Sequence, residues 1–88
     1  PVLFRTPTGE RRSGLDVTYA LKHMPLAQYA LHQATDGALT LRYSGAVARP
    51  DQLRDALLEV FGPDQVLDLV ETDLFATPGQ KMKQYIAD

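Results

Sequence analysis

Residues 26–44, LAQYALHQATDGALTLRYS, decide the fold because they predict two strands joined by a tight turn. Apolar residues occupy every second position on both sides of Asp36-Gly37, the pattern of a strand with one buried face. The apolar positions are Tyr29, Leu31, Leu39, Leu41 and Tyr43. Asp-Gly between two alternating runs is the strongest short-range hairpin signal. We therefore expect an antiparallel pair at the centre of the molecule.

A helix is predicted on the N-terminal side of this hairpin. Ser13 can serve as its N-cap, and Asp16 stands three residues later in a capping-box position. Helical spacing then brings four apolar residues to one face: Val17, Ala20, Leu21 and Met24. Pro25 is expected to end the helix, because proline lacks a backbone N–H and disfavours helical angles before it.

A second helix is predicted on the C-terminal side. Its apolar stripe consists of Leu53, Ala56, Leu57, Val60 and Phe61. Pro50 suits its first turn, Asp51 complements its dipole, and Gly62-Pro63 ends it.

The outer parts of the chain predict further strands. Residues 2–12 indicate a short hairpin around Pro7 and Gly9, 66–70 a strand, and 82–86 a short closing strand after a loop. Both helices have a single apolar stripe, so both should cover the same face of one sheet. We therefore predict an α+β, ferredoxin-like antiparallel sheet with two helices on one face, plus a C-terminal loop and short tail.

Size and composition limit the function classes. The chain of 88 residues suffices for a single domain, 1–88, and its 44% hydrophobic and 23% charged residues are typical of a globular protein. A net charge of −2 offers no basic field for nucleic acid or an anionic membrane. There is no cysteine, and no apolar run approaches the roughly 18 residues of a spanning helix. We expect a soluble, cytoplasmic chain.

Few side chains in the sequence are candidates for catalysis or for binding a ligand. His23 and His32 lack metal-ligand spacing, so no metal site is predicted. Four acidic residues gather near the last long strand, and a solvated face explains them best: Asp64, Asp68, Glu71 and Asp73. Arg11 and Arg12 could bind a phosphate, but neighbouring strand residues point to opposite faces, so only one could reach a given ligand.

The most promising position is Lys81. It follows Pro78 and Gly79, which shape a loop after a buried strand. Such a loop can present one long cationic side chain to a neighbouring domain, where an ammonium would stabilise a phosphate or carboxylate gaining charge. Lys83 is a competitor, because strand alternation would put it on the same side. We favour Lys81, although a lysine in a Pro-Gly loop is ordinarily just solvated.

These features resemble the C-terminal subdomain of AMP-forming adenylating enzymes, nearest to phenylacetate–CoA ligase-like and capsule-biosynthesis-type members. The resemblance covers essentially the whole chain through short motifs. They are Leu3-Phe4, Thr8-Gly9-Glu10-Arg11, Met24-Pro25, residues 27–33 and the ending 78–83, which is similar to the family's Gly-Lys loop.

The resemblance implies a mobile lid on a larger enzyme. The large N-terminal AMP-binding domain would bind ATP/Mg²⁺ and a carboxylic acid and form an acyl-adenylate, while the small domain delivers Lys81 to the site. In many members the small domain then rotates for thioester formation, so coenzyme A is a further candidate. The isolated chain is expected to be inactive. The identities of the acid and of the acceptor (coenzyme A, a carrier protein or an amine) and the oligomeric state are not encoded in these residues.

The chain departs from the family pattern at three places, one of which is the competing lysine, Lys83. The family's hinge run, Gly-Arg-x-x-Asp, would precede Pro1, and Gln80 stands where a second glycine is common. Because Pro1-Val2-Leu3-Phe4 starts within a strand-like run, we expect the chain to be part of something longer.

Two alternatives stay open. The first is a free-standing ferredoxin-like interaction or regulatory module without catalysis, since this fold hosts many functions. The second, a self-sufficient enzyme, is more distant because no nucleophile–base pair is visible.

Overall fold

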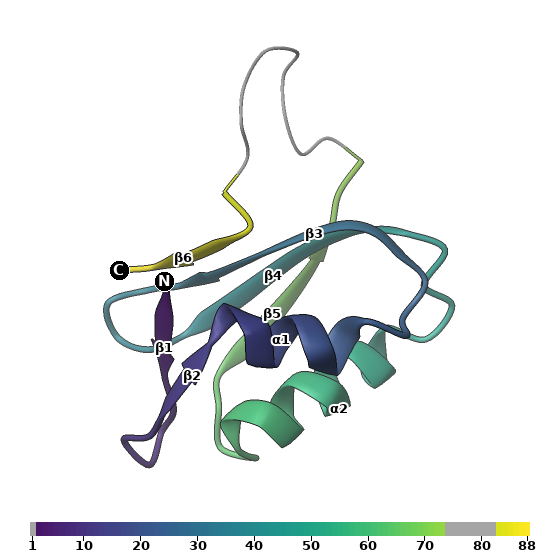
Figure 1. Ribbon diagram of the computed structural model, residues 1–88. Helices are drawn as coiled ribbons and strands as arrows, with labels where there is room; N and C mark the ends of the chain where they lie inside the picture. Colours follow the sequence, from purple (N-terminus) through teal and green to yellow (C-terminus); the bar gives the residue numbers. More distant parts are fainter. Residues whose placement is uncertain (1, 74–82) are drawn as a thin grey trace.

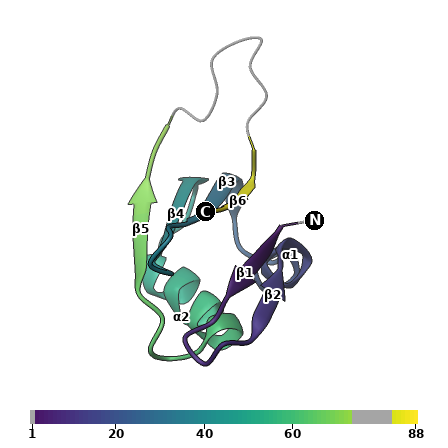
Figure 2. The same cartoon turned by 90° about the vertical axis from the view of Figure 1, so that its left-hand side faces the viewer.

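The computed structural model describes residues 2–73 and 83–88. A four-stranded sheet carries two helices on one face, and a two-stranded hairpin packs beside the first helix (Figure 1; Figure 2). The elements are β1 (Leu3–Arg5), β2 (Arg11–Ser13), α1 (Gly14–Leu21), β3 (Leu26–Gln33), β4 (Leu39–Gly45), α2 (Pro50–Phe61), β5 (Leu67–Glu71) and β6 (Tyr85–Ala87). The α+β prediction with two helices on one sheet face is confirmed.

The sheet is mixed, whereas the sequence led us to expect antiparallel pairing throughout. Its strand order is β5-β4-β3-β6. The central pair β3–β4 is antiparallel, with Tyr29 opposite Tyr43, but β5 runs parallel to β4 and β6 parallel to β3. Helix α2 causes the first of these parallel pairings, because it crosses over the sheet and returns the chain to the end where β4 began.

The turns of the two hairpins follow the predicted chemistry. Gly37 has φ +95° in the β3–β4 turn, and the Asp36 Oδ1 accepts a hydrogen bond from the Ala38 backbone N at 3.0 Å. Gly9 has φ +88° in the β1–β2 turn. These positive φ values favour glycine, so both hairpins form where the sequence indicated.

Helix α1 begins with the predicted capping box. The Asp16 backbone N donates to the Ser13 Oγ at 3.3 Å, and the Ser13 backbone N donates to the Asp16 Oδ2 at 2.8 Å. The helix ends at Leu21, one turn earlier than its apolar spacing suggested. The Met24 N bonds to the Leu21 carbonyl instead, a tight turn that prepares the chain for Pro25.

Helix α2 starts at Pro50 and turns its apolar stripe toward the sheet. Leu53, Leu57 and Phe61 are buried against the helix-facing side chains of the strands. The buried hydrophobic core consists of Phe4, Val17, Leu21, Leu31, Leu39, Leu41, Tyr43, Leu53, Leu57, Phe61 and Leu67. Phe4 is fully buried and meets the Phe61 ring edge-on at 5.9 Å, so it joins the β1–β2 hairpin to α2.

The closing strand is displaced from its predicted position. β6 comprises Tyr85–Ala87 rather than 82–86, because only these residues pair with β3 among those the structure describes. Neither helix in residues 2–73 and 83–88 has the length and apolar character needed to cross a bilayer.

Candidate functional site

The predicted site residues Lys81, Pro78 and Gly79 lie outside the described residues. The structure therefore describes only the residues on either side of this segment. Asp73 follows β5 and Lys83 precedes β6, and these are the two outermost strands of the sheet. The connection that contains Lys81 thus joins opposite edges of one sheet.

The competitor Lys83 is exposed. Among residues 2–73 and 83–88, its ammonium has no hydrogen-bond or ion-pair partner. Because the described residues offer this ammonium no partner, Lys83 stays a candidate beside Lys81.

A cluster of hydroxyl groups anchors β6 close to Lys83. The Tyr85 hydroxyl hydrogen-bonds to the Tyr29 hydroxyl at 2.6 Å and also to the Thr18 hydroxyl. The Tyr85 ring packs against Gly14 so closely that an added Cβ would lie 2.6 Å from the ring. Glycine at position 14 is therefore required by the close approach of β6 to α1.

Burial raises the pKa of the Tyr85 phenol above its ordinary value of 10.0. The hydrogen bond with Thr18 opposes this effect, and the neighbouring Tyr29 adds to it. Tyr85 therefore stays neutral over the physiological pH range. Its role is to anchor β6, and it does not act as an acid or base.

A cavity of about 340 Å³ lies between α1 and the beginning of β3. Lys22, Gln28 and Gln84 supply polar groups to its lining, and Leu21 and Leu26 supply apolar ones. Gln84 directly precedes β6, so this cavity is next to the described end of the segment that carries Lys81.

The Gln33 side chain connects the β1–β2 hairpin to the four-stranded sheet. Its Oε1 accepts from the Arg5 backbone N at 2.9 Å, and its Nε2 donates to the Arg5 carbonyl at 2.8 Å and the Gly37 carbonyl at 3.0 Å. The side chain is fully buried. The Gln33 side-chain amide therefore forms the two backbone hydrogen bonds with Arg5 that a neighbouring strand would form with β1. These bonds fix β1 to the end of β3.

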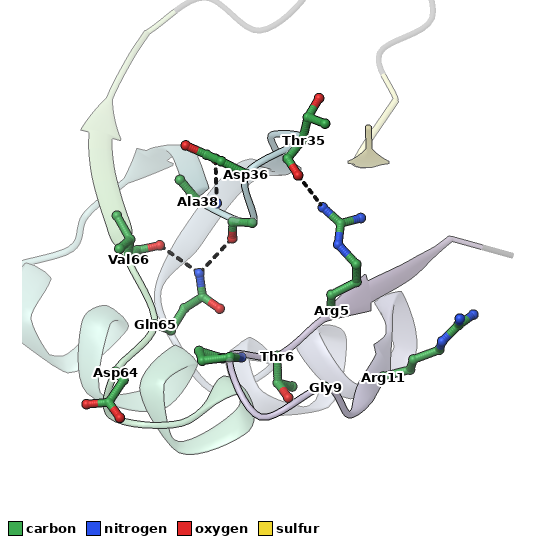
Figure 3. Close-up of a pocket in the computed structure, with 12 residues that line it drawn as sticks. Arg5, Thr6, Gly9, Arg11, Thr35, Asp36, Ala38, Asp64, Gln65 and Val66 are labelled. Atoms are coloured by element: carbon green, nitrogen blue, oxygen red, sulfur yellow. Dashed lines mark hydrogen bonds between the residues drawn. The ribbon is translucent and has the colours of Figure 1, made fainter.

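A cavity of about 550 Å³ forms a groove at the end of the molecule where three turns meet (Figure 3). We call it the three-turn groove. It is lined by the β1–β2 hairpin, the β3–β4 turn and the link between α2 and β5. Its charged residues are Arg5, Arg11, Asp36 and Asp64.

Arg5 and Arg11 are partners in the register of the hairpin. The Arg5 guanidinium donates to the carbonyl oxygens of Asp88 at 3.0 Å, Ala34 at 3.0 Å and Thr35 at 3.3 Å. Arg11 is exposed. Arg12, by contrast, donates to the Val60 carbonyl at 3.1 Å on the α2 side. The prediction that Arg11 and Arg12 face opposite ways is confirmed.

Gln65 forms a fixed part of the groove wall. It is 8% exposed, and its Nε2 donates to the carbonyls of Gly37 at 2.9 Å and Val66 at 2.8 Å. Two acceptors on one nitrogen settle the orientation of the amide, so the Oε1 faces away from both of them.

The histidines and acidic residues lie at the surface. His23 is exposed, and the His32 Nε2 lies 2.8 Å from the Asp88 Oδ2 at the end of β6. The four acidic residues near β5 are exposed, as the solvated-face prediction required: Asp64, Asp68, Glu71 and Asp73. Within the described residues, no three histidine or acidic side chains come together in a way that could hold a metal ion.

No protein-family model, curated protein or solved structure matches the chain.

Sequence reasoning missed the side chains that connect the turns around the three-turn groove. Gln33 appeared only within the family-like motif, and Arg5 and Gln65 carried no signal. Their roles depend on turns that are distant in sequence. The one available signal was the polar Gln33 on the apolar face of a strand, since a polar residue there must find buried partners.

Proposed function

We propose that the chain is the C-terminal lid domain of an ATP-dependent, acyl-adenylate-forming enzyme that activates carboxylates in the cytoplasm. Lys81 would supply the ammonium group, with Lys83 as its competitor. ATP/Mg²⁺ and the carboxylic acid would be bound mainly by an N-terminal AMP-binding domain of the same protein, and coenzyme A is a candidate acceptor.

The observation that carries this proposal is the length of the connection between β5 and β6. Two strands separate these edges, so the connection must bridge roughly 15 Å. A chain as long as residues 72–84 can reach roughly 40 Å when extended. The connection is therefore much longer than the sheet requires, and connections longer than about 12 residues are uncommon in compact domains, where many of them serve a function.

The anchoring of β6 supports the same conclusion. Tyr85 is held by Tyr29, Thr18 and the close contact with Gly14, which fixes the returning end of the connection. A lysine carried between two fixed strand ends can be delivered by rigid-body movement of the whole module.

Formation of an acyl-adenylate needs one positive charge between the carboxylate and the α-phosphate of ATP. When a carboxylate attacks the α-phosphate of ATP, negative charge approaches negative charge and is then redistributed. An ammonium group at this point lowers the barrier by offsetting that repulsion, and it does so most strongly when domain closure excludes water.

The test is acid-dependent exchange between ATP and pyrophosphate by the full-length protein from which the chain derives. We expect exchange with a panel of carboxylic acids, and neither exchange nor appreciable ATP binding by the 88-residue chain alone. A full-length protein that shows no exchange with any acid, or an isolated chain that binds ATP tightly, would contradict the proposal.

A further inference from the structure

Two arginines lie opposite each other in the register of the β1–β2 hairpin. Arg5 and Arg11 are direct register partners, so their side chains emerge on the same face, and both line the three-turn groove (Figure 3). Like charges directly opposite each other in an antiparallel pair are destabilising. The hairpin therefore brings two like charges to one face of the same strand pair.

The two arginines lack a direct side-chain carboxylate partner within the described residues. Arg5 is fixed by hydrogen bonds to the backbone oxygens of Ala34, Thr35 and Asp88. In residues 2–73 and 83–88, neither Arg5 nor Arg11 forms an ion pair with a side-chain carboxylate. The exposed guanidinium of Arg11 is suited to bidentate binding of a carboxylate or phosphate, and Arg5 adds a second positive charge to the same groove.

The opposite wall of the groove carries hydrogen-bond acceptors instead of positive charges. The Gln65 Oε1 is an acceptor whose direction is set by the two bonds of its Nε2. Asp36 lines the same region, as Figure 3 shows. These groups accept hydrogen bonds and disfavour an anion, so they suit hydroxyl or amino groups of a ligand.

We propose that the three-turn groove binds a small organic oxyanion, with its phosphate or carboxylate bound by Arg11 on the side of the groove that Arg5 also lines. Its hydroxyl or amino groups point toward Gln65 and Asp36. The volume of about 550 Å³ is in the range of small-molecule sites. This site does not involve Lys81 and is independent of the proposed function.

Amide NMR titrations of the chain at constant ionic strength test the proposal. The probes are glycerol phosphate, glycerate, inorganic phosphate and neutral glycerol. We expect saturable shifts at the Arg11 and Gly37 amides with glycerol phosphate or glycerate, weaker binding of inorganic phosphate and no response to glycerol. The first two probes distinguish a phosphate ligand from a carboxylate ligand.

Arg11→Gln is the decisive variant, because Arg5 also holds the fold together. It should weaken oxyanion binding about tenfold, the loss of roughly one charge-assisted interaction. Without ligand it should unfold at the same or a higher urea concentration, since it relieves the repulsion between like charges. Arg42→Gln, which removes an exposed arginine from β4 away from the groove, is the matched control and should bind normally.

Three outcomes would overturn the proposal. The first is the absence of saturable shifts with both organic oxyanions, and the second is an equal response to glycerol. The third is an Arg11→Gln protein that binds like the unchanged chain or is strongly destabilised without ligand, because Arg11 would then have no binding role or a structural one.

Discussion

At the scale of single residues, Gln33 is the side chain on which the assembly of the fold depends most. It satisfies both backbone groups of Arg5 and the carbonyl of Gly37 from a fully buried position. Gln33→Leu would leave these groups without partners away from water, which costs about 2–4 kcal/mol in the free energy of unfolding. Urea denaturation measures this loss. Gln28→Leu, exposed on the same strand, should stay within about 0.5 kcal/mol of the unchanged chain.

At the scale of elements, the attachment of β6 to α1 should depend on pH. The pKa of Tyr85 is raised chiefly by burial, so the folded chain keeps the phenol proton at pH values where the unfolded chain has lost it. The stability that Tyr85 contributes is therefore complete below the ordinary pKa of 10.0 and decreases as the pH rises above it.

Tyr85→Phe should consequently unfold with a flatter dependence on alkaline pH, measured as urea midpoints at several pH values. The variant also loses the hydroxyl contacts to Tyr29 and Thr18, so its stability at neutral pH should be lower. Tyr19→Phe, at an exposed position on α1, should keep the alkaline slope of the unchanged chain. An identical slope in Tyr85→Phe would contradict the assignment.

Element boundaries show how far local patterns could predict the structure. The capping box of Ser13 and Asp16, the Asp36-Gly37 turn and the stripe of α2 all depend on neighbouring residues, and all were predicted correctly. The end of α1 was predicted one turn too late, because the apolar Met24 continues the helical spacing although it lies in a turn before Pro25.

At the scale of the whole molecule, the sequence could not determine how the outer strands pair. Alternation of apolar and polar residues is the same in parallel and antiparallel strands, so the directions of β5 and β6 depend on crossovers. The three-turn groove was missed for a related reason. Each of its turns looks ordinary by itself, and only the assembled fold places Arg5, Arg11 and Gln65 around one cavity.

The overall shape also bears on how a lid could work. The helices cover one face of the sheet and the core lies between these layers, so the module can move as one body (Figure 1). The long connection between β5 and β6 starts and returns at opposite edges of that body. A proposed partner domain would thus meet a lysine carried by a rigid module.

The measurement that tests this account most directly compares Lys81→Ala with Lys83→Ala in acid-dependent ATP–pyrophosphate exchange by the full-length protein. We predict that Lys81→Ala lowers the exchange rate about 100- to 1,000-fold with the fold intact, the usual effect of removing one charge-stabilising group. Lys83→Ala should keep most of the activity. Undiminished exchange in Lys81→Ala, together with its loss in Lys83→Ala, would contradict the central claim.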